Sequence, residues 1–175
     1  MFIDIEDPRI GDWIREGKIF IYPTDTVYGL GCDATNVFSV KKIKDIKGKN
    51  APFSIIAPGK AWIKKHCECG NEIEKLPGPF TFLYKSDFKG EFNNNLEILG
   101  VRIPNHEFSE IIKREGLPFI TTSVNKTGNK PAKSVQEMPQ EILKEVDFII
   151  DLGPIQGKSS TIIDYSQTPP KVIRA

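Results

Sequence analysis

The residues best suited to chemistry gather where an apolar strand ends, in the stretch Pro23-Thr-Asp-Thr-Val-Tyr-Gly-Leu-Gly31. Small hydroxyl side chains and glycines allow backbone amides and Oγ atoms to approach a ligand closely. An ordinary strand end followed by a turn has the same composition, with Thr24 and Asp25 satisfying backbone groups. From these residues alone, a ligand site and a simple turn both stay open. If a ligand binds here, we expect Gly29 and Gly31 to clear the space around it.

A second polar run, Thr121-Thr-Ser-Val-Asn-Lys-Thr-Gly128, follows directly on an apolar strand expected at Pro118–Thr122. In open α/β sheets, ligands bind outside the carboxyl ends of the strands. An ordinary loop is also rich in Ser, Thr and Asn. The run therefore favours a binding site without naming its ligand.

A lysine cluster adds positive charge between these two stretches, at Lys41, Lys42, Lys44, Lys47 and Lys49. Lys47 and Lys49 lie between a predicted helix and a predicted strand, where ammonium groups could reach a polyphosphate as point charges. For the other three lysines, a solvated helix face is the favoured interpretation.

Two further motifs do not meet the requirements of the sites that they resemble. Gly153-Pro-Ile-Gln-Gly-Lys-Ser159 looks like a phosphate-binding P-loop, but three residues separate its glycines where four are required, and a strand follows. His66-Cys67-Glu68-Cys69 contains zinc-ligand types without a second pair to complete four ligands. We interpret it as the surface end of a helix and predict no bound metal there.

The elements that must position these residues are predicted to form one α/β domain over residues 1–175. Strand and helix patterns alternate, and neither linker nor repeat interrupts them. Helices are expected at Asp7–Gly17, from about Ser39 to Gly48, around Trp62, after a cap at Asn105, and after a capping box at Ser134–Glu137. Strands are expected at 18–23, 53–57, 81–85, 100–103, 118–122, 148–152, 161–164 and 171–173.

The last three of these strands lie close together in the sequence, so some antiparallel pairing is expected and the sheet should be mixed. The general composition agrees with a globular protein: hydrophobic residues make up 39%, charged residues 27%, and the net charge is +1. No apolar run is long enough to span a membrane. An acidic amino terminus and an odd number of cysteines lead us to expect a cytoplasmic location.

Taken in order, the motifs resemble the YrdC family, the threonylcarbamoyl-adenylate synthases. The matching pieces are Pro23–Gly31, Lys47-Gly-Lys49 with Pro52, Pro77–Thr81, Val101–Pro104, Ser123-Val-Asn125 with Thr127-Gly128, Ser160-Thr161, and Ile173-Arg174. No single piece is decisive, but the ordered set is highly specific and spans nearly the whole chain. The resemblance implies a YrdC-like fold, an open twisted mixed sheet of about seven strands with flanking helices around a positively charged cavity.

It also implies a reaction. L-threonine, bicarbonate and ATP would give threonylcarbamoyl-AMP and pyrophosphate, the first step toward threonylcarbamoyladenosine (t6A) in tRNA. Such an L-threonylcarbamoyladenylate synthase is a nucleotidyltransferase, and its Mg²⁺ would arrive with ATP. The implied macromolecular partners are tRNA or double-stranded RNA and the threonylcarbamoyl transferase proteins of the later step.

The same resemblance carries roles over to individual positions. The residues implied to bind threonine are Thr26, Arg102, Thr121 and Ser160. Those implied to bind ATP are Lys49, Ser123, Asn125 and Arg174. Lys47 and Lys49 would act in catalysis by neutralising charge as pyrophosphate leaves. The carbamate nucleophile is already anionic, so the reaction requires neither a histidine nor a covalent serine.

The sequence departs from the family pattern in three places. Lys49 stands where an arginine is usual, which keeps the charge but loses the planar fork. The loop to Pro52 is short, and Ile56 stands near where some members place a threonine-contacting histidine. The extra carboxyl-terminal domain of longer members is expected to be absent.

Two alternatives to the synthase stay open. One is a non-catalytic module that binds double-stranded RNA or tRNA. The other is a diverged paralogue that acts on another carbamoyl or acyl adenylate. The role of Asp25 is also open, between a ligand-side carboxylate and the cap of its own turn.

Overall fold

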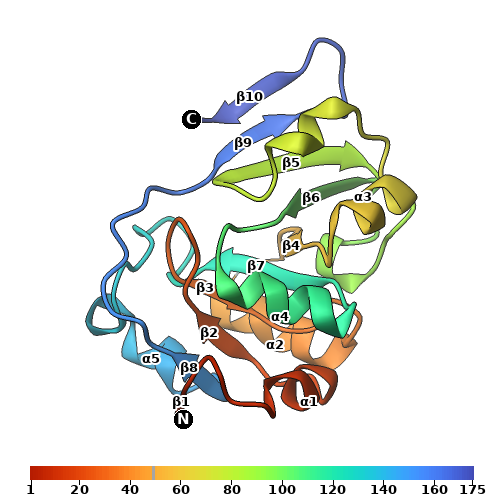
Figure 1. The fold of residues 1–175 in the computed structure, drawn as a ribbon. Helices are drawn as coiled ribbons and strands as arrows, with labels where there is room; N and C mark the ends of the chain where they lie inside the picture. The colour runs from red at the N-terminus through yellow and green to blue at the C-terminus, as the bar shows by residue number, and fades with distance from the viewer. Residues whose placement is uncertain (49) are drawn as a thin grey trace.

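The structure, a computed structural model, describes residues 1–48 and 50–175. Within them, ten strands form one sheet in the order β1-β8-β2-β3-β7-β4-β6-β5-β9-β10 (Figure 1). Their bounds are β1 Phe2–Ile3, β2 Phe20–Tyr22, β3 Gly29–Gly31, β4 Ser54–Ile56, β5 Phe80–Lys85, β6 Ile98–Arg102, β7 Phe119–Ser123, β8 Phe148–Ile150, β9 Thr161–Asp164 and β10 Lys171–Arg174. The helices are α1 Ile10–Arg15, α2 Val37–Lys47, α3 Lys60–His66, α4 Glu107–Glu115 and α5 Gln140–Leu143, with short 3₁₀ turns η1 Asn71–Lys75, η2 Glu91–Asn93 and η3 Val135–Glu137.

The predicted mixed α/β sheet is confirmed. β8 pairs in parallel with β1 and β2, while β3 is antiparallel to both β2 and β7. Of the last three strands, β9 and β10 pair antiparallel as expected, but β8 lies far from them at the other end of the sheet. Figure 1 shows β9 and β10 at the top and β8 at the bottom.

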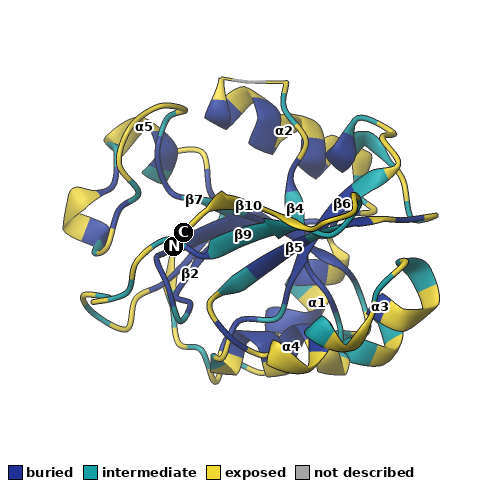
Figure 2. Ribbon diagram, turned by 90° about the horizontal axis from the view of Figure 1, so that it is seen from above, coloured by how far each residue is buried: buried dark blue, intermediate teal, exposed yellow. Residues whose placement is uncertain are grey.

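Alternate residues of the strands face two separate hydrophobic cores. Ile19 and Ile21 belong to the core that also contains α2, whereas Phe20 and Tyr22 belong to the core beneath α1 and α4. Figure 2 shows α2 on one side of the sheet and α1 and α4 on the opposite side. The period-two alternation of β2 therefore sets the three layers.

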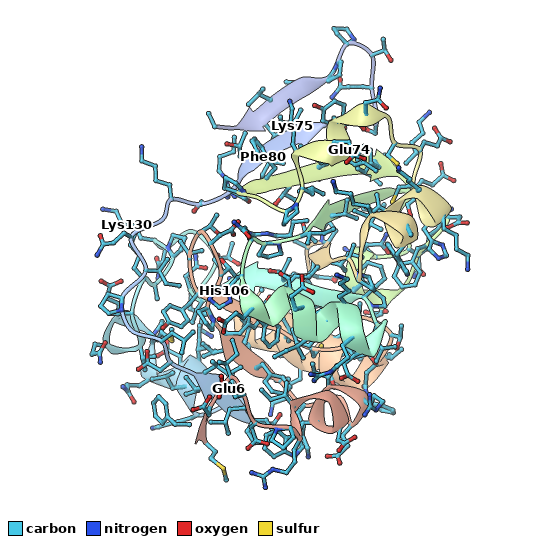
Figure 3. All side chains as sticks on the ribbon, viewed as in Figure 1. Glu6, Glu74, Lys75, Phe80, His106 and Lys130 are labelled. Atoms are coloured by element: carbon cyan, nitrogen blue, oxygen red, sulfur yellow. The ribbon has the colours of Figure 1, made fainter. Side chains whose placement is uncertain are left out.

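Three helix starts differ from the predictions. α1 begins at Ile10 with Arg9, and not Asp7, at the cap position, and no side chain caps it. α2 begins before Ser39, because the Asn36 side chain accepts the Ser39 N–H at 3.1 Å as the cap. α4 is capped not by Asn105 but by His106, whose Nδ1 accepts the Phe108 N–H at 3.2 Å. His106 lies at the start of α4 in Figure 3. α2 and α4 both end at glycines with positive φ, as the sequence predicts.

The predicted capping box at Ser134 is wrong. Ser134 makes no capping hydrogen bond, and Glu137 Oε2 accepts the Lys133 N–H at 2.8 Å instead. Pro139 follows Met138 and disfavours helical geometry there, so the segment divides into η3 and the short α5.

Two strands were not expected from the sequence, β1 and β3. β3 contains two glycines in three residues, a poor strand by propensity. It forms because it pairs on both sides, with Tyr22 opposite Gly29 and Thr122 opposite Leu30. In the described residues, no helix has both the length and the apolar character needed to cross a membrane.

Candidate active site

A cavity of about 190 Å³ opens on the sheet, between the β2–β3 loop, β4 and the residues before β9. Its lining includes Thr24, Thr26–Gly29, Pro52–Ser54, Thr81, Arg102, Thr121–Ser123, Ser159–Ser160, Ile162 and Arg174. Six residues that the sequence analysis assigned to substrates thus meet here: Thr26, Arg102, Thr121, Ser123, Ser160 and Arg174.

The register explains why polar side chains reach this cavity. Paired residues on neighbouring strands face the same side of a sheet, as do residues two apart on one strand. Ser54 pairs with Thr121, and Ile56 pairs with Arg102. Ile56 belongs to the core beneath α1 and α4, so Thr121 and Arg102 point to that same side. The cavity therefore lies on the same face of the sheet as the core beneath α1 and α4, beyond the last residues of that core.

Arg102 is the most constrained charge in the cavity. It is only 7% exposed, and its Nη2 donates to Asp25 Oδ1 at 2.8 Å and to Thr26 Oγ1 at 3.1 Å. Its Nε is buried and has no hydrogen-bond partner among the described residues. Burial lowers the pKa of Arg102, and the Asp25 carboxylate opposes that shift. The guanidinium is thus held from one side and retains unused donor capacity for a ligand.

The loop that carries Thr26 is fixed by its own hydroxyls. Thr24 Oγ1 donates to the Val27 carbonyl at 2.7 Å and accepts the Thr26 N–H at 3.1 Å. The two threonine Oγ1 atoms are 2.9 Å apart. Asp25 Oδ2 accepts the Asn105 N–H at 2.9 Å, which ties the loop to the chain leaving β6. Asp25 therefore holds protein groups with both oxygens, and it is not among the residues that line the cavity.

Arg174, on the edge strand β10, supplies the second positive charge. Its Nε and Nη2 donate to the Ser160 carbonyl at 3.0 and 2.8 Å, and Nη2 also lies 3.1 Å from Ser160 Oγ. Ser160 Oγ in turn lies 2.9 Å from Thr81 Oγ1. The charge of Arg174 contributes to lowering the pKa of Arg102, so the two guanidinium groups act on the same space.

Lys47 and Asn125 lie behind the cavity wall, not in it. Lys47 is the last residue of α2, and its Nζ donates to the carbonyls of Ser123 and Asn125, both at 2.7 Å, and to Asn125 Oδ1 at 3.0 Å. Ser123 Oγ donates to the same amide oxygen. The buried ammonium thus fixes the loop after β7. Lys49, the other predicted catalytic lysine, lies outside the described residues.

The remaining lysines of the cluster divide differently from the prediction. Lys41 and Lys42 are exposed, as expected for a solvated face. Lys44 is buried, and its Nζ contacts Glu91 Oε1 at 2.9 Å and Asn94 Oδ1 at 2.6 Å. The solvated-face interpretation is therefore wrong for Lys44, because η2 packs against α2 and brings an acidic partner to it.

Both glycines of the first stretch make room for protein groups, and Gly29 also lines the cavity. A Cβ on Gly29 would collide with the Tyr22 ring, and one on Gly31 with the Ile120 carbonyl oxygen. The expectation that they clear space around a substrate is therefore wrong for Gly31 and stays a prediction for Gly29. They allow the short strand β3 to pack between its neighbours.

The sequence analysis missed the strap, which we define as residues 151–160 between β8 and β9. Tyr28 holds its start: the Tyr28 hydroxyl contacts Asp151 Oδ1 at 3.0 Å and the Gly153 carbonyl at 2.8 Å, and it accepts the Leu152 N–H at 3.2 Å. Further along, a Cβ on Gly157 would collide with the Thr26 carbonyl oxygen. The strap thus passes directly over Thr26. Gly153 and Gly157 were the signal for the strap in the sequence, but the sequence analysis considered them only as part of a P-loop.

The described residues contain no group of three or more His, Cys, Asp or Glu side chains arranged to hold a metal ion. His66 and Cys67 lie at the end of α3, as predicted, and His66 Nδ1 is 2.9 Å from Asp87 Oδ1. The segment that follows the P-loop-like stretch is strand β9, as predicted.

Comparison with known proteins gives a consistent result. Residues 12–175 match the profile of the Sua5/YciO/YrdC family, described as "Telomere recombination". A Methanocaldococcus jannaschii protein named after threonylcarbamoyl-AMP synthase is 35% identical over 158 residues, covering 86% of this chain and 75% of its own. The threonylcarbamoyl-AMP synthase of Pyrococcus abyssi is 32% identical, and the match covers 95% of this chain. It covers only 55% of the P. abyssi protein, so this chain spans about half of that relative.

Solved structures agree on the fold. The crystal structure of P. abyssi Sua5 complexed with L-threonine superimposes with a TM-score of 0.86 at 28% identity, covering 99% of this chain and 56% of that one. E. coli YciO superimposes with a TM-score of 0.81 at 24% identity, covering 99% and 92% of the two chains. At 24% identity, the similarity to E. coli YciO supports the fold alone.

Proposed function

The chain belongs to the Sua5/YciO/YrdC family, and from this premise we propose that it is an L-threonylcarbamoyladenylate synthase. The proposed reaction converts L-threonine, bicarbonate and ATP to threonylcarbamoyl-AMP and pyrophosphate, for t6A modification of tRNA. The observation that carries the proposal is the pair of guanidinium groups, Arg102 and Arg174, facing one hydroxyl-lined cavity. Such a cavity fits an amino acid carboxylate beside a phosphate.

On the amino acid side, Arg102 would bind the threonine carboxylate with the donors that Asp25 and Thr26 leave unused. The hydroxyls of Thr26, Thr121 and Ser160 would contact its amine and side-chain hydroxyl. These side chains are already fixed by neighbours, so little conformational entropy is lost when the substrate binds. The name of the P. abyssi complex, which contains L-threonine, supports this assignment.

On the nucleotide side, Arg174 and the loop Ser123–Asn125 would bind ATP, together with Lys49. Lys47 would act through this loop, because its ammonium holds the Ser123 and Asn125 carbonyls. Mg²⁺ would enter as part of the substrate, bound to the ATP phosphates.

The proposed chemistry needs alignment and charge neutralisation more than acid–base groups. The threonine amine adds to bicarbonate-derived CO₂ and loses a proton, which gives a carbamate anion. A carbamate oxygen then forms a bond to the α-phosphorus as the bond from that phosphorus to the bridging oxygen of pyrophosphate breaks. Arg174, Lys49 and the metal would neutralise the departing charge.

The proposal is tested by incubating the chain with MgATP and bicarbonate and measuring pyrophosphate release as threonine is added. We expect release to depend on both threonine and bicarbonate, and threonylcarbamoyl-AMP to appear in equal amount. Lys41→Ala, on the exposed face of α2, should behave as the wild type. Release that is indifferent to threonine, or greater with another amino acid in a panel, would contradict the proposal and favour a diverged paralogue.

A further inference from the structure

Asp25 binds the buried Arg102 guanidinium and does not itself line the cavity. Its Oδ1 accepts from Arg102 Nη2 at 2.8 Å, and its Oδ2 accepts from the Asn105 backbone at 2.9 Å. The side chain is 13% exposed beside the 8% of Arg102, so both charges are largely withdrawn from water. Because each carboxylate oxygen has a protein donor and the residue does not line the cavity, Asp25 faces the protein and not the ligand.

We propose that Asp25 is a positioning residue that orients the Arg102 guanidinium toward the substrate carboxylate. This inference rests on the proposed function in one respect only, that the ligand of Arg102 is threonine. A free arginine side chain has four rotatable bonds, and fixing them costs conformational entropy. Because Asp25 fixes Arg102 before the ligand binds, binding does not bear this cost. The remaining donors of the planar fork are then aimed as a set.

The charges of the site support this role. Among the described residues that line the cavity, Arg102 and Arg174 carry the permanent charges, and both are positive. Burial and the neighbouring guanidinium both lower the pKa of Arg102, and the Asp25 carboxylate offsets part of that lowering. Two guanidiniums and one carboxylate leave a net positive charge at the cavity, which favours the anionic groups of both proposed substrates. Without Asp25, the two guanidiniums would repel each other and Arg102 would be free to turn away.

The contact with Asn105 gives Asp25 a second point of attachment. Asn105 follows β6 by three residues and precedes the His106 cap of α4. The Asn105 N–H at the β6–α4 corner therefore fixes the Asp25 carboxylate, and the carboxylate in turn fixes the Arg102 guanidinium. A carboxylate that bound the substrate amine directly would need an oxygen that faces the cavity, whereas Asp25 does not line the cavity and each of its oxygens accepts from a protein donor.

The test is calorimetric titration of Asp25→Asn with L-threonine in the absence of ATP. Asparagine keeps the size and one acceptor but removes the charge, so we expect threonine affinity to fall about tenfold or more. Asp33→Asn is the matched control, because Asp33 is also buried but, within the part of the chain that the structure describes, its carboxylate accepts from Thr35 and from no arginine. It should leave threonine affinity unchanged. Thermal unfolding checks that both variants are folded.

Two analogues separate positioning from direct contact. 3-Hydroxybutyrate lacks the amine of threonine, and we expect Asp25→Asn to weaken its binding by the same factor. L-Threoninol lacks the carboxylate, and its binding should not respond to the substitution. Equal binding of threonine by the wild type and Asp25→Asn would overturn the inference, as would a loss seen with threoninol but not with 3-hydroxybutyrate. Because titration involves no ATP, a wild type that binds threonine but releases no pyrophosphate would overturn the proposed function and leave this inference standing.

Discussion

The two arginines of the cavity are held in different ways. Arg102 lies on the inner strand β6, is 7% exposed and is paired with a carboxylate. Arg174 lies on the edge strand β10, is exposed to solvent, and donates to neutral oxygens of Ser160, with no carboxylate partner among residues 1–48 and 50–175. The difference indicates that Arg102 is a fixed charge for a ligand of defined shape, whereas Arg174 can adjust its position. A fixed fork suits an amino acid carboxylate, and an adjustable cation suits a phosphate chain that changes during the reaction.

Replacing Arg102 by Lys should have the largest effect on this comparison. Lysine keeps the charge but lacks the planar fork of donors. It therefore cannot reproduce the bond to Asp25 together with bonds to the threonine carboxylate. We expect the KM for threonine to rise about a hundredfold, since hydrogen bonds to charged groups contribute about 1.5–3 kcal/mol each. Steady-state pyrophosphate release at varied threonine measures it.

The matched variant is Arg174→Lys, which makes the same exchange at the adjustable arginine. Its effect should be smaller and should appear in the KM for ATP, not in that for threonine. If both exchanges changed the same KM by the same factor, the proposed division of labour between the two arginines would be wrong.

The strap joins the two sides of the cavity, because it crosses Thr26 and ends at Ser160, the residue that Arg174 contacts. Gly157→Ala would place a methyl group against the Thr26 carbonyl oxygen. We expect the free energy of unfolding to fall by about 1–3 kcal/mol, as in other overpacked sites. Affinity for both substrates should weaken. Urea denaturation gives the first quantity, and titration with each substrate the second.

Gln156→Ala is the control, since Gln156 neighbours Gly157 on the strap but its side chain is exposed. It should change neither stability nor affinity. A Gly157→Ala protein as stable and active as this control would show that the strap does not press on the threonine loop.

The smallest expected effect concerns pH and the corner that supports Asp25. Burial lowers the pKa of His106 below its usual 6.5, and its neutral Nδ1 caps α4. As pH falls below 6.5 the unfolded chain takes up the proton first, so stability decreases until the folded pKa is reached and then levels off. The loss should be smaller than that caused by Gly157→Ala, and urea denaturation between about pH 7.5 and pH 5 measures it. His106→Asn keeps a capping side chain without this titration. A variant with the same pH dependence as the wild type would mean that another group is responsible.

Much of the fold could be predicted from the sequence because periodic patterns determine the faces of strands and helices. Phe20 and Tyr22 alternate with Ile19 and Ile21, and the sheet uses both sets. The strand β3 could not be predicted in this way, since its glycines are favourable only between the strands that flank them. Nor could the burial of Lys44, which depends on a carboxylate 47 residues away in sequence.

Six of the predicted site residues could be named from the sequence, but the contacts among them could not. The ordered motifs named Thr26, Arg102, Thr121, Ser123, Ser160 and Arg174, and the structure brings these residues to one cavity. The pairing of Asp25 with Arg102 joins residues 77 apart, and no local spacing encodes it. Lys47 looked like a phosphate ligand because its type and position fit one, yet its contacts are with the Ser123–Asn125 loop.

The most direct test of the central claim is an experimental structure of this chain with L-threonine and a non-hydrolysable MgATP analogue. We predict that the threonine carboxylate lies within hydrogen-bonding distance of the Arg102 guanidinium, while Asp25 keeps its contacts with Arg102 and Asn105. The triphosphate should lie toward Arg174 and Ser123. A structure with phosphate on Arg102, or with threonine bound away from it, would contradict the account.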